Sequence, residues 1–216
     1  MPDTDISTPA SVIGADASAR VTRKRPKPGE RRVQILQTLA QMLQQPGAER
    51  VTTAALAARL EVSEAALYRH FASKAQMFEG LIDFVESTVF GLINQISERE
   101  AAGPARAARI VAMVLQFGEK NPGMARVMVG DALVHEHERL QQRMNQLFDK
   151  LDAALRQCLR EGTAAAENGP LTPDADAQVI ASVLTAFVAG RLQRFARSGF
   201  RRLPTEQLDA CLKRIL

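Results

Sequence analysis

Tryptophan is absent from this chain of 216 residues, tyrosine occurs once and cysteine twice. The two cysteines, Cys158 and Cys211, lie far apart, each within a stretch of helical apolar spacing. They therefore indicate neither a disulfide framework nor a metal site. Cysteines in such surroundings usually behave as small buried apolar side chains, and we expect that of both.

Long apolar runs and strand-like alternation are missing as well. No uninterrupted apolar stretch approaches the roughly 18 residues of a membrane helix, and the N-terminus has no apolar signal-like region. We therefore expect a cytosolic protein without a membrane partner. Alanine, leucine, glutamine and arginine, which are good helix formers, dominate instead. With 46% hydrophobic residues the chain can bury a real core, and an all-α fold is predicted.

Enzyme signatures are also missing. The sequence has no nucleophile-elbow, Walker or dinucleotide-binding motif, and its carboxylates fall on helix faces expected to be exposed. The run His-Glu-His-Glu at 135–138 suggests a metal site, but on a helix side chains two residues apart diverge. We therefore expect a protein that is not an enzyme, with no cofactor and no metal.

Positive charge is concentrated near the N-terminus. Residues 1–19 contain no Lys or Arg, whereas 20–32 contain seven and a single acid, within a chain of net charge +4. Such a cluster suits an arm that lies along DNA phosphates, and a solvated tail is the alternative. We expect residues 1–28 to form a disordered tail with a basic end.

Apolar spacing divides the rest into a domain over 29–75 and a second domain over 76–216. The first predicted helix ends at Pro46. Two short helices follow, capped by Thr52 or Thr53 and by Ser63, and then a long one over 74–97, capped by Ser73. Further helices are predicted over about 105–120, 124–130, 132–161, 174–198 and 205–215.

The two short helices and the tight turn at 61–63 between them form a candidate helix-turn-helix motif, whose second helix could enter a major groove of about 12 Å width. Leu67 and Phe71 are expected to pack it down. Small alanines allow close approach, a helix start can bind phosphate, and the remaining side chains supply donors. The candidate DNA contacts are Thr52, Thr53, Ala65, Ala66, Tyr68, Arg69, His70 and Lys74.

Short alanine-rich helices are common, and Tyr-Arg-His could simply form a polar surface. However, the segment 52–74 resembles the DNA-binding domain of TetR-type regulators. Their pattern T-x-x-x-L-A-x-x-x-x-V-S followed by L-Y-x-H-F-x-x-K is met at every fixed position, from Thr52 to Lys74. The resemblance implies a TetR-like all-α fold, with an N-terminal DNA-binding domain and a C-terminal helical dimerisation domain.

Further stretches, among them SEAALYRHF, FGEKNPG and RFxRSxFxxxPT, resemble one branch of that family, the nucleoid occlusion factors of proteobacteria. This resemblance implies a homodimer on palindromic double-stranded DNA, associated with the nucleoid. Once bound to DNA it would contact the division protein FtsZ and block Z-ring assembly and septation. The residues that the resemblance assigns to FtsZ binding are Phe84, Met113, Lys120 and Asn121.

Four alternatives remain open from the sequence. Phe84 could belong to the core, and Asn121 could merely cap a helix end before Pro122. The long helices over 132–161 and 174–198 suit a four-helix bundle with a second copy, but could pack within one chain. The protein could also be a TetR-type transcriptional repressor that is released by a small apolar ligand.

Overall fold

The structure is a computed structural model that describes residues 29–45, 51–163 and 173–216. The expected N-terminal tail and most of its basic arm lie outside these residues. The described part contains only helices and their connections, which confirms the all-α prediction. The elements are α1 Glu30–Leu43, α2 Thr53–Arg59, α3 Glu64–Tyr68, α4 Lys74–Arg99, α5 Pro104–Lys120, α6 Pro122–Met128, the 3-10 helix η1 Asp131–Leu133, α7 Glu138–Thr163, α8 Pro173–Arg197 and α9 Leu208–Ile215.

Serine and threonine caps set the helix starts of the N-terminal domain. The hydroxyls of Thr52, Ser63 and Ser73 accept hydrogen bonds from the backbone N–H three residues further on, at 3.1, 3.3 and 3.2 Å. Each bond satisfies an N–H group that has no partner within its helix. These caps confirm the predicted starts of α2, α3 and α4.

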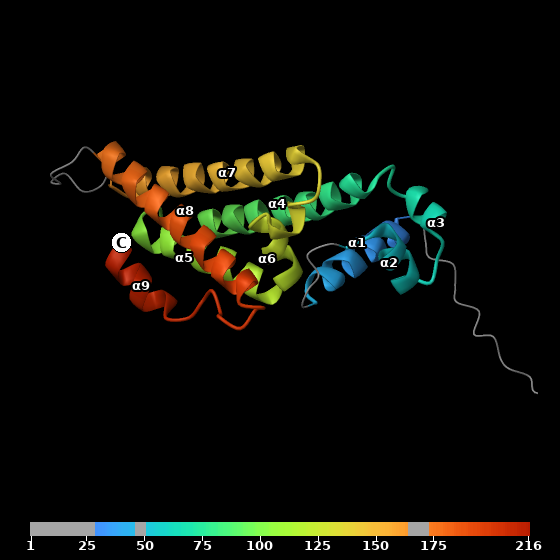
Figure 1. Cartoon of the computed structure of the whole chain (residues 1–216). Helices are drawn as coiled ribbons and strands as arrows, with labels where there is room; N and C mark the ends of the chain where they lie inside the picture. Colours follow the sequence, from blue (N-terminus) through green and yellow to red (C-terminus); the bar gives the residue numbers. More distant parts are fainter. Residues whose placement is uncertain (1–28, 46–50, 164–172) are drawn as a thin grey trace, which may run out of the picture.

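The helices form a small group and a larger bundle (Figure 1). Helices α1, α2 and α3 gather at one end of the molecule, and α4 runs from them along the larger bundle, in which α7 and α8 pack side by side. α1 packs on α4 and α6, which joins the two parts. One continuous core of buried apolar side chains extends from Ile35 to Leu212.

The helix predicted over 132–161 is wrong at its start. η1 ends at Leu133, and α7 begins only at Glu138. Gly130, which precedes the predicted start, adopts a left-handed φ of 81° before η1, and residues 134–137 then form a turn rather than helix. The N–H of Arg139 donates to Nδ1 of His137 at 3.3 Å, so the imidazole serves the first turn of α7.

The helical argument against a metal at 135–138 therefore rested on a wrong premise. His135 and His137 lie in the turn before α7, and both are exposed. Within the described residues, no three His, Cys, Asp or Glu side chains are grouped so that they could hold a metal ion.

The two cysteines differ from each other. Cys158 is buried as expected, with 3% of its surface exposed. Cys211 is only half-buried, which corrects the expectation that both lie in the core. Its Sγ lies 3.1 Å from Nη2 of Arg191, because this side of α9 meets the polar end of α8 rather than apolar core.

Helix α8 has more apolar surface than one chain covers. By length and composition, residues 174–197 could cross a membrane, a feature that the sequence analysis did not single out, and 28% of the candidate stretch is buried within the protein. Its buried stripe, which includes Leu184, Val188 and Leu192, packs in the core. On a different side, Val179 and Val183 are 58% and 46% exposed.

Gly123 allows α6 to lie directly against α1. A Cβ atom at this position would fall 2.2 Å from the backbone oxygen of Ala40, which cannot rotate away. We expect Gly123→Ala to lower the free energy of unfolding by about 2–3 kcal/mol and the melting temperature by roughly 5–10 °C. Gly91→Ala in α4 is the matched control, because nothing lies within 4 Å of its new Cβ. Calorimetry should show a gain of up to about 1 kcal/mol there, and equal losses in both variants would contradict the steric argument.

Candidate nucleic-acid and partner interfaces

The turn between α2 and α3 is held by backbone hydrogen bonds. The N–H groups of Glu61 and Val62 donate to the carbonyls of Ala58 and Ala57, at 3.1 and 3.0 Å. Glu61 adopts a left-handed φ of 56°, which reverses the chain between the two helices. The side-chain bond from Thr53 Oγ1 to Glu64 Oε2, at 2.6 Å, ties the starts of α2 and α3 together. These contacts fix the helix-turn-helix geometry that the sequence predicted.

One side of α3 faces the core and the other faces solvent. Leu67 and Phe71 are each 1% exposed, as expected. Tyr68 is 44% exposed although it lies directly beside Leu67. The predicted contact residues Thr52, Ala65, Tyr68, Arg69 and His70 are exposed, whereas Thr53, Ala66 and Lys74 are half-buried.

Three of the predicted DNA contacts already have partners inside the protein. The hydroxyl of Thr52 accepts from the N–H of Ala55 as the cap of α2. The hydroxyl of Thr53 binds Glu64 as described above. The ammonium of Lys74 forms an ion pair and hydrogen bond with the carboxylate of Glu136, across 62 residues of sequence. The structure thus brings the predicted residues to one end of the molecule, with Lys74 engaged by the C-terminal domain.

Arg32 was counted with the basic arm, and the structure gives it a different environment. Its guanidinium carbon lies 4.0 Å from the centroid of the Phe71 ring, and its Nη1 donates to the carbonyl of His70 at 2.7 Å. Arg32 therefore fastens the start of α1 to the end of α3. Sequence reasoning missed this role, since no local pattern links residues 38 positions apart.

The four residues assigned to partner binding lie on α4, on α5 and at the end of α5. Phe84 is 49% exposed, so the structure does not place it in the core, and its ring centroid lies 6.4 Å from that of Phe117 on α5. Asn121 donates from Nδ2 to the carbonyl of Phe117 at 2.8 Å, which shows that it does cap the helix end. Lys120 is exposed beside it.

Met113 lines an open hollow of about 500 Å³ between α4 and α5. Met113 lies one helical turn from Phe117, whose ring is near that of Phe84, but neither phenylalanine is among the residues that line the hollow. Its apolar lining is bordered by two arginines that the sequence analysis did not select, because their proximity arises only when the two helices pack. The lining includes Leu92, Ile96, Arg99, Arg109, Met113 and Gln116.

A second hollow, of about 730 Å³, lies between α8 and the segment before α9. It is lined by Phe187, Arg191, Arg194 and Arg202 among others, and it is also open to the surface. Neither hollow resembles the closed apolar chamber that a ligand-released repressor requires.

Comparison with known proteins agrees with this arrangement. Residues 35–81 match the family described as bacterial regulatory proteins, tetR family. Residues 104–215 match the SlmA-like form of the tetracyclin repressor-like C-terminal domain. The chain belongs to the TetR family, in its SlmA-like branch.

Curated relatives support the same branch. The chain is 48% identical to the nucleoid occlusion factor SlmA of Idiomarina loihiensis over 180 residues, which are 83% of this chain and 90% of the relative. It is 49% identical to SlmA of Citrobacter koseri over 181 residues, again 83% and 90%. These relatives are DNA-binding regulators rather than enzymes. The resemblance stated from the sequence is thereby confirmed.

Solved structures of TetR-type regulators share the fold. The Bacillus subtilis regulator FadR, solved with stearoyl-CoA, superimposes with a TM-score of 0.65 at 14% identity, over 85% of this chain and 96% of that one. A regulator from Aquifex aeolicus superimposes with a TM-score of 0.66 at 16% identity, over 86% and 99%. At these identities the likeness concerns the fold alone.

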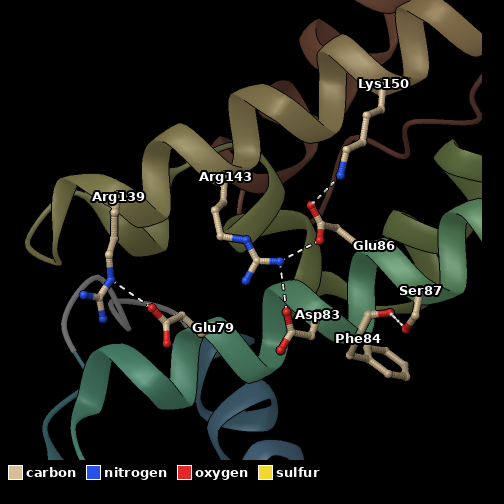
Figure 2. A network of polar contacts seen from close by, with 8 residues as sticks. All are labelled: Glu79, Asp83, Phe84, Glu86, Ser87, Arg139, Arg143 and Lys150. Carbon is tan, nitrogen blue, oxygen red and sulfur yellow. Dashed lines mark hydrogen bonds and ion pairs between the residues drawn. The ribbon is translucent and has the colours of Figure 1, made fainter.

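A row of ion pairs attaches α4 of this SlmA-like protein to α7 (Figure 2). Nη2 of Arg143 lies 2.9 Å from Oδ1 of Asp83 and 2.6 Å from Oε2 of Glu86. Burial opposes the charge of Arg143, but the hydrogen bonds and charges of Asp83 and Glu86 outweigh it and raise the pKa of Arg143. The guanidinium therefore stays charged and holds two carboxylates of α4 at once.

Two further pairs extend this row. Nε of Arg139 lies 2.8 Å from Oε1 of Glu79, and Nζ of Lys150 lies 3.6 Å from Oε1 of Glu86. Phe84 points away from these pairs, on another side of α4 (Figure 2). Helix α4 thus exposes Phe84 to solvent, while its carboxylates, on another side, form the ion pairs that hold it to α7.

Proposed function

We propose that this chain is a nucleoid occlusion factor that binds palindromic DNA as a homodimer and, when bound, contacts FtsZ and blocks Z-ring assembly and septation over the chromosome. The observation that carries the proposal is the course of α4. This single helix begins beside the candidate recognition helix at Lys74 and presents Phe84 on the candidate partner face. DNA occupancy and partner contact therefore share one rigid element.

The DNA-binding part rests on the exposed side of α3. Tyr68, Arg69 and His70 are exposed and supply hydrogen-bond donors, while Ala65 leaves room for close approach. Thr52 is exposed at the start of α2, and its hydroxyl, which accepts from the N–H of Ala55, can still donate to a phosphate oxygen. These features support sequence reading by α3 and phosphate contact at the helix starts.

The dimer rests on the second apolar side of α8. Val179, Val183 and Ala186 are exposed along one side of this helix, which would leave apolar surface in water in a single chain. Pairing α7 and α8 with their copies would form a four-helix bundle and cover that side. Two-fold symmetry would then place two α3 helices about 34 Å apart, one turn of DNA.

The partner site rests on the hollow between α4 and α5. Met113 supplies apolar contact inside the hollow, and Arg99 and Arg109 border it, with Glu100 paired to Arg109. Phe84 on α4 and the exposed Lys120 on α5 lie outside the lining, on the same two helices. A peptide segment with apolar and acidic side chains fits such a surface, because cations favour carboxylates and the apolar lining favours burial of apolar side chains. The assignment of this surface to FtsZ rests on the family resemblance stated from the sequence.

The test is a sedimentation assay of FtsZ filaments assembled with GTP, with the protein and a duplex selected from random DNA by the wild-type chain. We expect the wild-type protein to reduce pelleted FtsZ only when the duplex is present. Lys120→Ala should bind DNA within about twofold and lose roughly tenfold in FtsZ potency, the size of one charge-assisted contact. Lys213→Ala, an exposed lysine on α9, is the matched control and should behave as wild type.

Two results would contradict the proposal at different levels. If the wild-type protein with DNA leaves FtsZ unaffected, the proposed function is wrong. If Lys120→Ala loses DNA binding and FtsZ inhibition together, the function stands but the site assignment is wrong.

A further inference from the structure

Lys74 is turned toward the C-terminal domain in this structure. Its ammonium pairs with Glu136 and lies 5.7 Å from the centroid of the Phe78 ring. Phe78 is buried one turn further along α4, so the lysine side chain extends along its own helix toward that ring. This candidate DNA contact is therefore held by two groups that belong to the protein.

Glu136 is well placed to retain this lysine. Its side chain is 10% exposed and that of Lys74 is 25% exposed, so water screens the pair only partly. A carboxylate with so little solvent requires a cation nearby. Glu136 lies in the turn between η1 and α7, where its N–H donates to the carbonyl of Leu133 at 3.0 Å. The pair thus connects the start of α4 to the start of α7.

The polarity of this pair differs from that of its neighbours. The described residues form several other ion pairs between α4 and residues 136–150. In each of those, α4 supplies the carboxylate and α7 supplies the base, as in the pair of Glu79 with Arg139 (Figure 2). Those pairs can persist whether or not DNA is bound. Among these pairs of the described residues, that of Lys74 and Glu136 is the one whose cation is a candidate DNA contact.

We propose that Glu136 competes with a DNA phosphate for Lys74, so that it restrains DNA binding, and that DNA binding in turn releases the 134–137 turn. The inference rests on the proposed function, because it takes Lys74 as a phosphate contact. Two oxyanions at one ammonium repel each other, so each weakens the other's hold. The long, flexible lysine stem allows the ammonium to move between them.

Linkage makes the effect reciprocal. If Glu136 lowers the affinity for DNA by a given factor, DNA lowers the stability of the Lys74–Glu136 pair by the same factor. Release of Glu136 would loosen the turn, which also contains Val134, 65% exposed. DNA binding would thereby alter the mobility of the first residues of α7.

The experiment measures DNA affinity by fluorescence anisotropy at 0.15 M salt, with full-length dimer and the selected duplex. We expect Glu136→Gln to tighten binding about threefold to tenfold and Lys74→Ala to weaken it. In the Lys74→Ala background, Glu136→Gln should not change the DNA affinity, because the ammonium for which Glu136 and the phosphate compete is absent. Glu79→Gln is the matched control: it removes the same charge further along α4 and should not tighten binding.

Each outcome decides a different claim. Weaker or unchanged binding by Glu136→Gln, with Lys74→Ala still impaired, overturns the competition and leaves the proposed function intact. An equal gain in both backgrounds overturns it as well, because it would reflect long-range charge alone. Unchanged affinity of Lys74→Ala removes the phosphate contact and the competition together.

The wild-type chain supplies a readout that needs no variant. Hydrogen exchange of residues 134–137 should become faster when the duplex is added, because the turn loses its hold on Lys74. Unchanged or slower exchange there, with DNA bound, would overturn the release of the turn.

Discussion

Val183→Asp is expected to split the protein into monomers and to weaken DNA binding by about 100-fold or more. Val183 is 46% exposed on the apolar side of α8 that we assign to the dimer. A two-fold interface contains every residue twice, so the substitution would place two carboxylates in a surface that excludes water. Sedimentation should show the mass fall from twice the chain mass of 23.6 kDa to that value.

The loss of DNA affinity follows from the loss of the second half-site. Two linked recognition helices bind a palindrome far more tightly than one, because the second contact is made at high effective concentration. Ala105→Asp is the matched control, an exposed alanine in the first turn of α5 where a carboxylate suits the helix dipole. It should remain dimeric. A dimeric Val183→Asp protein would show that α8 pairs through another side or not at all.

Tyr68→Ala is expected to weaken DNA binding about 10- to 30-fold without changing the melting temperature by more than about 2 °C. The ring is 44% exposed at the end of α3, so its removal takes contact from the DNA and little from the core. Tyr68→Phe separates the hydroxyl from the ring. Anisotropy titrations at several salt concentrations are the measurement.

The salt dependence identifies which kind of contact is lost. Tyr68 is neutral, so its removal should leave the slope of log Kd against log salt unchanged, whereas Lys74→Ala should reduce the slope by about 1. Leu67→Ala serves as a contrast, because Leu67 is 1% exposed and its loss should destabilise the fold by about 2–5 kcal/mol. Unchanged affinity of Tyr68→Ala would exclude Tyr68 as a DNA contact and contradict reading by the exposed side of α3.

Local chemistry explains which elements the sequence predicted well. Ser63 and Ser73 begin α3 and α4 because a hydroxyl can satisfy an N–H three residues further on, which depends only on near neighbours. The apolar period placed Leu67 and Phe71 inward and left Tyr68 outward. The predicted start of α7 was wrong for the opposite reason: helical apolar spacing included Leu133, whereas the structure has a 3-10 helix at 131–133 and a turn at 134–137, where Glu136 pairs with the distant Lys74.

The amino-acid sequence by itself determined the all-α class, the helix-turn-helix and the family, because helix period, caps and motif residues act over a few positions. Tertiary structure alone decided which side chains are engaged: Arg32 at Phe71, Lys74 at Glu136, and Phe84 beside Phe117. It also decided that Arg99 and Arg109 border one hollow, and that α8 retains an exposed apolar side. Such proximities depend on how helices pack across tens of residues, which no periodicity along the chain encodes.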